Sequence, residues 1–177
     1  MTISVGAETH KGAISTVLSF LSHNKYDQVK IVNDISLVRL KTPLTFSATV
    51  SRVALMAHPP YEEEAIVAGW GEYDDQYHKY PKTLQYTTQF VKNRELCAQL
   101  LKKHHLKDGT FCASNHDGYP SKGDSGSALV VRNYIQIGLV SNKLKKPTEY
   151  NRNVVVYTDT GFHYEWIKTS AKKIMCE

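Results

Sequence analysis

The chain has 177 residues, of which 41% are hydrophobic, 10% aromatic and 22% charged. This length and composition fit one globular domain, or two small halves that share a cleft, and they exclude collagen-like, low-complexity and disordered chains. The 22 lysines and arginines outnumber the 17 acidic residues and give a net charge of +5, but they are scattered along the sequence. We therefore expect no nucleic-acid partner.

No apolar run in the sequence approaches the roughly 18–20 residues that a membrane span needs. The early apolar stretch, residues 13–21, is interrupted by serine and threonine and follows Glu8, so it does not match the core of a signal peptide. We expect no membrane partner, and we find no signal peptide in this chain.

The elements predicted in chain order are mainly short strands. Short apolar segments, separated by turns that contain Gly, Pro, Asp and Asn, predict these strands. They cover residues 31–40, 65–70, 83–91, 128–131, 134–140 and 154–158. Residues 56–64, with two prolines and three glutamates, are the best candidate linker between two halves.

Two predicted helices interrupt the β pattern. The first begins near Asn93, a suitable N-cap, and carries Leu96, Leu100 and Leu101 on one face. The second covers residues 163–175 and has a narrow apolar stripe. Many short strands with a late helix predict an all-β barrel or sandwich.

One short motif carries chemistry. Residues 123–127 read Gly-Asp-Ser-Gly-Ser and precede an apolar strand. A serine flanked by glycines at a loop tip can expose its hydroxyl and let backbone N–H groups approach a carbonyl oxygen, as a nucleophile with an oxyanion hole requires. By itself, the same motif also fits an ordinary turn.

Four other segments before and after this motif occur in a characteristic order along the chain. They are residues 33–40 (Asn-Asp-Ile-Ser-Leu-Val-Arg-Leu), 68–71 (Ala-Gly-Trp-Gly), 138–141 (Gly-Leu-Val-Ser) and 156–158 (Val-Tyr-Thr). With the terminal helix, the series resembles the chymotrypsin/trypsin-like serine proteases over nearly the whole chain. Residues 23–27 look most like arthropod, including mite, members.

The resemblance implies an all-β fold: a trypsin-like double β-barrel with the first barrel incomplete, the second complete, and a C-terminal helix. Residues 1–177 would form one peptidase domain. Within it, residues 1–57 would be the remainder of the N-terminal barrel, and residues 58–177 the linker, the C-terminal barrel and the terminal helix. By the same resemblance, the protein would be secreted.

The resemblance also assigns roles to single residues. Ser125 would be the nucleophile, and Asp34 the carboxylate that orients the imidazole of a catalytic histidine. The N–H groups of Gly123 and Ser125 would form the oxyanion hole. Ser141 matches the family's serine beside that aspartate, and Asp124 matches the aspartate that receives a new N-terminal ammonium on activation.

The three cysteines fit no zinc-binding spacing, and we expect neither a metal nor a cofactor. Cys97 and Cys112 bracket the segment where the family has a disulfide, which would close a loop of about 15 residues and add roughly 3 kcal/mol of stability. Ala65 and Val131 stand where many relatives have another cysteine pair. Cys176 has no assigned partner.

The family's catalytic histidine lies in a Thr-Ala-Ala-His-Cys segment that nothing here matches. Residues 2–6 resemble the strand after that segment, so on the order of fifty preceding residues are expected to be missing. None of the eight histidines has the required place. They are His10, His23, His58, His78, His104, His105, His116 and His163. We expect the catalytic histidine to be absent and the chain not to hydrolyse peptides at protease-like rates.

The specificity pocket also departs from the family pattern. The substrate-binding residues that the resemblance implies are Tyr119, Ser141, Asn142, Lys143 and Val155. The side chains of Tyr119, Lys143 and Val155 would narrow a deep pocket and offer no negative charge to a basic residue. If the missing segment with the catalytic histidine were restored, we therefore expect no cleavage after Arg or Lys, and at best cleavage after small or apolar residues. A shifted loop that turns Asp117 inward would reverse this expectation.

Three interpretations stay open. The first is a trypsin-like serine endopeptidase domain that acts on protein or peptide substrates. The second is an inactive protease homologue that serves as a protein-binding module, and the third is a truncated chain without a stable fold. If the first barrel lacks its opening strands, its remaining strands expose edges and an apolar face, so we expect self-association.

Overall fold

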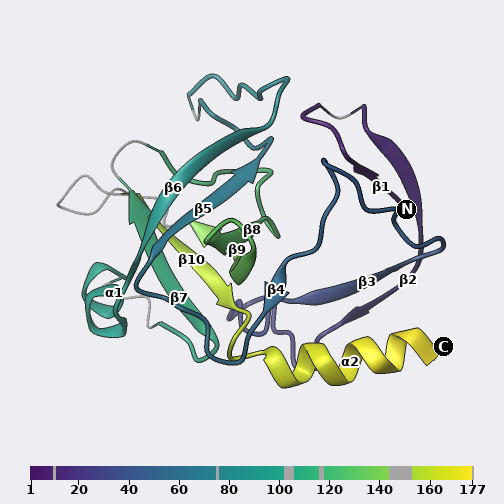
Figure 1. Cartoon of the computed structure of the whole chain (residues 1–177). Helices are drawn as coiled ribbons and strands as arrows, with labels where there is room; N and C mark the ends of the chain where they lie inside the picture. The colour runs from purple at the N-terminus through teal and green to yellow at the C-terminus, as the bar shows by residue number, and fades with distance from the viewer. Residues whose placement is uncertain (10, 75, 102–105, 116–117, 144–152, 177) are drawn as a thin grey trace.

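The computed structural model describes the chain except residues 10, 75, 102–105, 116–117, 144–152 and 177 (Figure 1). The described elements, in chain order, are β1 Thr2–Val5, β2 Ala13–Ser22, β3 Ser36–Leu40, β4 Ala54–Leu55, β5 Glu64–Gly69, β6 Gln85–Lys92, α1 Arg94–Leu101, β7 Thr110–Asn115, β8 Ala128–Val131, β9 Ile135–Lys143, β10 Asn153–Asp159 and α2 Tyr164–Cys176. The predicted all-β class with a C-terminal helix is confirmed.

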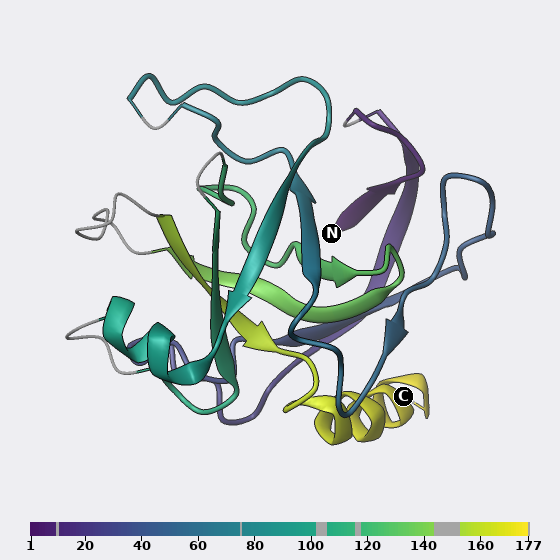
Figure 2. The ribbon, with the colours of Figure 1, turned by 60° about the vertical axis from the view of Figure 1, so that its left-hand side comes forward.

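Six strands close into a barrel (Figure 2). They pair in the order β10-β7-β6-β5-β8-β9, and β10 also pairs with β9, so the sheet closes on itself. The short strand β4 adds to β9 in parallel, whereas the strands of the barrel pair antiparallel. Leu129, Ile137 and Tyr157 are fully buried in the barrel core. This closed barrel confirms the predicted complete second barrel.

The first sheet stays open. Strands β1, β2 and β3 pair antiparallel in that order, and in the described residues neither outer strand has a second neighbour. Helix α2 runs beside β2 and β3 (Figure 1). The guanidinium of Arg39 in β3 donates a hydrogen bond of 2.8 Å to the carbonyl of Ile174 near the end of α2. The predicted incomplete first barrel is thus confirmed as an open sheet that α2 supports.

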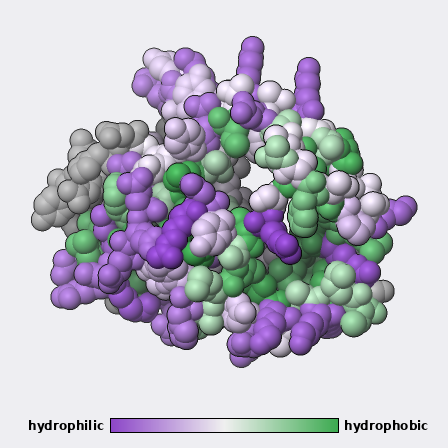
Figure 3. All heavy atoms as spheres, viewed as in Figure 1, coloured by the Kyte–Doolittle hydropathy of each residue, from purple (hydrophilic) through white to green (hydrophobic). Residues whose placement is uncertain are grey.

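One face of the open sheet is apolar and exposed. On β2, the exposed fractions of Ile14, Leu18 and Phe20 are 66%, 53% and 68%. Val38 on β3, directly opposite Phe20 in the pairing register, is 46% exposed. Figure 3 shows hydrophobic atoms gathered on this side of the molecule, around a hollow between the open sheet and the barrel. A contiguous apolar surface of this kind favours association.

The helix and cysteine predictions hold in detail. The Asn93 side chain accepts a hydrogen bond of 2.8 Å from the N–H of Leu96, so Asn93 caps α1 as expected. Cys97 in α1 forms the predicted disulfide with Cys112 in β7, and both are fully buried. The disulfide therefore fixes α1 against the barrel.

Two parts of the strand prediction differ from the structure. The strand expected over residues 31–40 begins only at residue 36, because Ile31 and Asn33 have φ of 50° and 52°, in the left-handed region that strands do not use. The sequence patterns also did not predict β2, β4 and β7. Ala65 and Val131 lie directly opposite each other across β5 and β8, and both are fully buried, so apolar packing occupies this position.

Candidate active site

The carboxylate of Asp124 anchors the loop that carries Ser125. One carboxylate oxygen of Asp124 accepts a hydrogen bond of 2.8 Å from the N–H of Gly71, and the other accepts one of 2.9 Å from the N–H of Ser121. A Cβ at Gly69 or Gly71 would collide with this carboxylate. The two glycines therefore leave the space in which Asp124 anchors the loop.

A second contact orients the peptide between Lys122 and Gly123. The carbonyl of Lys122 accepts a hydrogen bond of 2.8 Å from the N–H of Glu72. Because C=O and N–H point in opposite directions in a trans peptide, the N–H of Gly123 points away from Glu72. Gly123 has a φ of 102°, which only glycine adopts readily.

Two backbone N–H groups at Ser125 are arranged so that they could bind an anion. Among the described residues, neither the N–H of Gly123 nor that of Ser125 donates to a protein acceptor, whereas the neighbouring N–H groups of Gly126 and Ser127 do. Ser125 itself is exposed. Two available N–H groups beside an exposed hydroxyl are what an oxyanion hole beside a nucleophile requires.

Asp34 lies on the loop before β3 and is fixed by the barrel. The hydroxyl of Ser141 donates a hydrogen bond of 2.7 Å to its carboxylate, and the hydroxyl of Thr158 donates one of 3.0 Å to its carbonyl. Asp34 and Ser125 line one cavity of about 390 Å³. The structure thus brings together Ser125, Asp34 and Ser141, which the sequence places far apart.

No histidine lines this cavity in the described part of the chain. His23 packs against the rings of His163 and Trp166, with ring centroids 5.6 Å and 4.9 Å away. His58 is exposed in the linker, and His78 is exposed in the loop after β5. His10, His104, His105 and His116 lie outside the described residues.

A second cavity, of about 490 Å³, adjoins Ser125 on its other side. It is lined by Glu72, residues 120–122, Ser125 and residues 140–143. Ser141, Asn142 and Lys143 therefore border it, as the resemblance implies. Tyr119 and Val155 are not among its described lining residues, and Val155 is fully buried.

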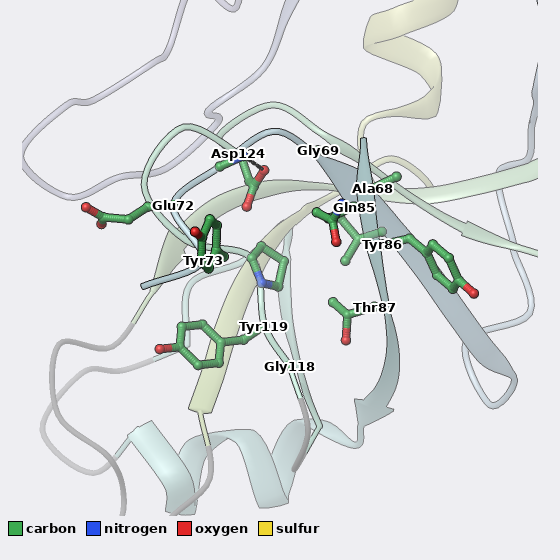
Figure 4. Close-up of a pocket in the computed structure, with 13 residues that line it drawn as sticks. Ala68, Gly69, Glu72, Tyr73, Gln85, Tyr86, Thr87, Gly118, Tyr119 and Asp124 are labelled. Carbon is green, nitrogen blue, oxygen red and sulfur yellow. Dashed lines mark hydrogen bonds between the residues drawn. The ribbon is translucent and has the colours of Figure 1, made fainter. Parts of the chain in front are cut away.

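Tyr119 lines a different cavity, of about 340 Å³, behind the loop of residues 120–124. Figure 4 shows Asp124 and Tyr73 near one end of this cavity and Tyr86 at the other. The Tyr119 ring, predicted for the base of the specificity pocket, thus lines this cavity, and the ammonium of Lys143 lies 3.9 Å from its centroid. Counting residues back from Ser125 could not reveal this placement, because the spacing of residues does not show which cavity a side chain lines.

No cluster of three or more histidine, cysteine or acidic residues that could hold a metal ion occurs in the described ranges. Neither helix of the described chain is long and apolar enough to cross a membrane. Both findings concern the described residues only.

Comparison with known proteins identifies the family. The family model described as Trypsin matches residues 1–167. Hypodermin-B of Hypoderma lineatum is 31% identical over 165 residues, which cover 92% of this chain and 63% of that protein. Trypsin alpha of Drosophila melanogaster is 28% identical over 166 residues, covering 92% and 64% respectively. The chain thus spans less than two thirds of the length of these relatives.

Solved structures agree on the fold. The structure titled "Structure of GrC" superposes with a TM-score of 0.83 at 25% identity, covering 97% of this chain and 78% of that one. The scabies mite inactivated protease paralogue S-D1 gives a TM-score of 0.83 at 20% identity, covering 97% and 76%. The fold is that of the trypsin-like proteases. The chain belongs to the trypsin family.

Proposed function

We propose that the chain carries the acyl-transfer apparatus of a serine endopeptidase without its general base. Ser125 is the nucleophile, the N–H groups of Gly123 and Ser125 bind the oxyanion, and Asp34, held by Ser141, is the carboxylate that orients an imidazole. The observation that supports this proposal is that Asp34 and Ser125 border the same cavity of about 390 Å³. The substrates are proteins or peptides, and the protein is secreted, as the resemblance implies.

The 177-residue chain is inactive toward peptide bonds in this proposal. A serine hydroxyl with no base beside it stays protonated and is a weak nucleophile. No described histidine reaches the cavity between Asp34 and Ser125. Removing one member of such a triad leaves roughly 10³–10⁴-fold acceleration over water, from the oxyanion hole and binding alone.

A fluorophosphonate probe with and without added imidazole tests both statements. In the attack, the Ser125 oxygen bonds to phosphorus, fluoride leaves, and imidazole in the cavity takes the hydroxyl proton while Asp34 accepts its other N–H. We expect little labelling without imidazole and labelling that rises with imidazole concentration. Ser125→Ala should abolish labelling, and Asp34→Ala should remove most of the imidazole effect.

Two results decide against the proposal. Stoichiometric labelling of Ser125 without imidazole would show that the chain has its own base. Labelling that imidazole does not increase would show that Asp34 and Ser125 do not act together.

The second candidate function is a protein-binding module on an inactivated protease scaffold. The observation that favours it is the exposed apolar face of the open sheet, with Phe20 68% and Val38 46% exposed. In this alternative, residues 1–57 supply the binding surface, and residues 58–177 supply the stable barrel. A chain that binds a protein partner while its Ser125 resists labelling with imidazole present would favour it.

A further inference from the structure

The side chain of Glu72 is buried beside the serine loop, and among the described residues its carboxylate has one partner. The Glu72 side chain is 5% exposed, and its Oε1 lies 2.5 Å from Nδ1 of His78. Because an ionised carboxylate only accepts hydrogen bonds, the His78 ring is the donor. A buried carboxylate without a donor is costly, so the contact with His78 stabilises the buried position of Glu72.

The loop that follows Glu72 folds back so that His78 returns to it. The carboxylate of Asp74 accepts hydrogen bonds of 3.1 Å from the N–H groups of Gln76 and Tyr77, and the backbone of Asp74 pairs with that of Lys79. His78 has a φ of 51°, in the left-handed region that histidine adopts more readily than most residues. The loop therefore places a ring that is 72% exposed against a buried carboxylate.

The backbone of Glu72 contacts the oxyanion loop directly. Its N–H donates a hydrogen bond of 2.8 Å to the carbonyl of Lys122. This bond fixes the plane of the peptide between Lys122 and Gly123, and with it the direction of the Gly123 N–H. Because glycine has more backbone freedom than other residues, this plane needs such a contact to stay in place. One residue, Glu72, thus connects the ring of His78 with a proposed oxyanion donor.

We propose that His78 is a positioning residue for the oxyanion hole. Its ring keeps the Glu72 carboxylate buried, and from that position the Glu72 N–H orients the peptide between Lys122 and Gly123. The inference deepens the proposed function and rests on it for the role of the Gly123 N–H. Without the ring, the carboxylate would move toward water and weaken the bond to Lys122, so that the Gly123 N–H would lose its fixed direction.

Hydrogen exchange of the Glu72 amide, followed by NMR in the full 177-residue chain, tests this assignment. The bond to Lys122 protects this amide, so its exchange rate reports whether the peptide is held. His78→Ala should speed exchange at Glu72 at least about tenfold, a factor that loss of one buried hydrogen bond supports. The amides of Gly126 and Val140, which donate to other carbonyls near Ser125, should keep their rates.

Two further variants assign the effect to the side-chain contact. His78→Asn should restore slow exchange, because its amide nitrogen can take the place of Nδ1 and asparagine tolerates a left-handed φ. Lys79→Ala is the matched control, since it removes the ion pair with Asp74 from the same loop and should leave exchange at Glu72 unchanged.

A double variant separates the contact from backbone strain. Glu72→Leu removes the carboxylate that needs a donor, so adding His78→Ala to it should not change exchange at position 72 any further. The strain of alanine at a positive φ is present in both backgrounds. An additional increase in the double variant would therefore assign the effect to strain and overturn the proposal.

Three other results would also overturn it. They are unchanged exchange at Glu72 in His78→Ala, an equal acceleration at Val140, and exchange in His78→Asn as fast as in His78→Ala. Exchange decides on His78 whether or not Ser125 reacts, whereas absence of imidazole-dependent labelling in the unmodified chain contradicts only the proposed function. Where labelling occurs, it should be about tenfold slower in His78→Ala, because one oxyanion donor is misplaced, and equal rates would contradict the role of His78.

Discussion

Ser141 and Asp34 lie 107 residues apart in the sequence, yet the Ser141 hydroxyl donates a hydrogen bond of 2.7 Å to the Asp34 carboxylate. Ser141 belongs to β9 of the closed barrel, and Asp34 precedes β3 of the open sheet. This bond therefore joins the two sheets at the point where the candidate active site lies.

Ser141→Ala removes this bond and should lower the free energy of unfolding by about 1.5–2 kcal/mol, the low end of the range for hydrogen bonds to charged groups, because the pair is only partly buried. Urea denaturation measures the change. Ser36→Ala, an exposed serine nearby on β3, is the control and should be nearly neutral. A loss no larger than that of the control would contradict the importance of the bond.

Gly71→Ala should be costly, because its Cβ would overlap the Asp124 carboxylate that anchors the serine loop. We expect a loss of about 2–3 kcal/mol, typical of overpacking at a fixed site. At Gly126 an added Cβ meets nothing within 4 Å, so Gly126→Ala should cost only about 1 kcal/mol of backbone strain from its positive φ. Thermal denaturation of both variants compares them, and an equal loss would contradict the collision at Gly71.

Replacement of Cys97 and Cys112 by serine should destabilise the chain by about 3 kcal/mol, because the disulfide closes a short loop in the unfolded state. The two cysteines are 15 residues apart in the sequence. Urea denaturation measures the loss, and Cys176→Ser is the control, since Cys176 is exposed and outside the disulfide. Equal stability of the double variant and the control would show that packing of α1 against β7 suffices.

His23 should make the fold sensitive to mild acid. Burial lowers the pKa of His23 below its usual value of 6.5, and its electrostatic interactions with His163 and Lys25 lower it further. Its Nδ1 also accepts a hydrogen bond of 3.1 Å from the N–H of Lys25, which protonation at that nitrogen would break. Below pH 6.5 the unfolded chain therefore binds more protons than the folded chain, and stability falls as the pH drops.

Melting temperatures between pH 5 and pH 7 measure this effect. His23→Phe keeps a ring beside Trp166 and should flatten the dependence on pH. His58→Gln, at an exposed linker position, should leave the dependence unchanged. An unchanged slope in His23→Phe would assign the acid sensitivity to other groups.

The exposed face of the open sheet should drive self-association. Phe20→Thr removes the exposed aromatic side chain of this face and should shift the chain toward monomer, because less apolar surface is then buried on association. Val29→Thr is the control, since Val29 is 94% exposed in a loop outside the face. Light scattering over a concentration series measures the shift. A sharp monomeric peak for the unmodified chain, with cooperative melting, would contradict the prediction.

Local sequence patterns predicted mainly the strands and the helix whose apolar residues pack into the core of the barrel. The strands of the closed barrel other than β7, and the Asn93 cap, are of this kind. Strand β2 is not, because its apolar residues fall on both faces of the strand and do not alternate with polar ones; they are Ile14, Val17, Leu18, Phe20 and Leu21. The late start of β3 depends on left-handed residues at Ile31 and Asn33; asparagine often adopts this conformation, but isoleucine rarely does, so its residue type does not predict it.

The candidate site was predicted only through the resemblance to a family. Ser125 lies in a local motif, but nothing in the spacing of the sequence pairs Asp34 with Ser141. The resemblance placed Lys143 at the specificity pocket, but the direction of its ammonium, 3.9 Å from the centroid of the Tyr119 ring, could not be predicted, because a lysine side chain has many rotamers.

The bond from Arg39 to the carbonyl of Ile174 spans 135 residues. During synthesis on the ribosome, strands β1 to β3 emerge before the barrel strands β5 to β10, and the helix that supports them is made after both. The barrel strands pair mostly with near neighbours in the sequence, whereas the open sheet depends on a helix that follows the whole barrel. Contacts of such long range slow folding, so the open sheet is translated before the barrel but is secured after it. A chain cut before residue 164 would therefore keep the barrel strands but leave the open sheet unsupported.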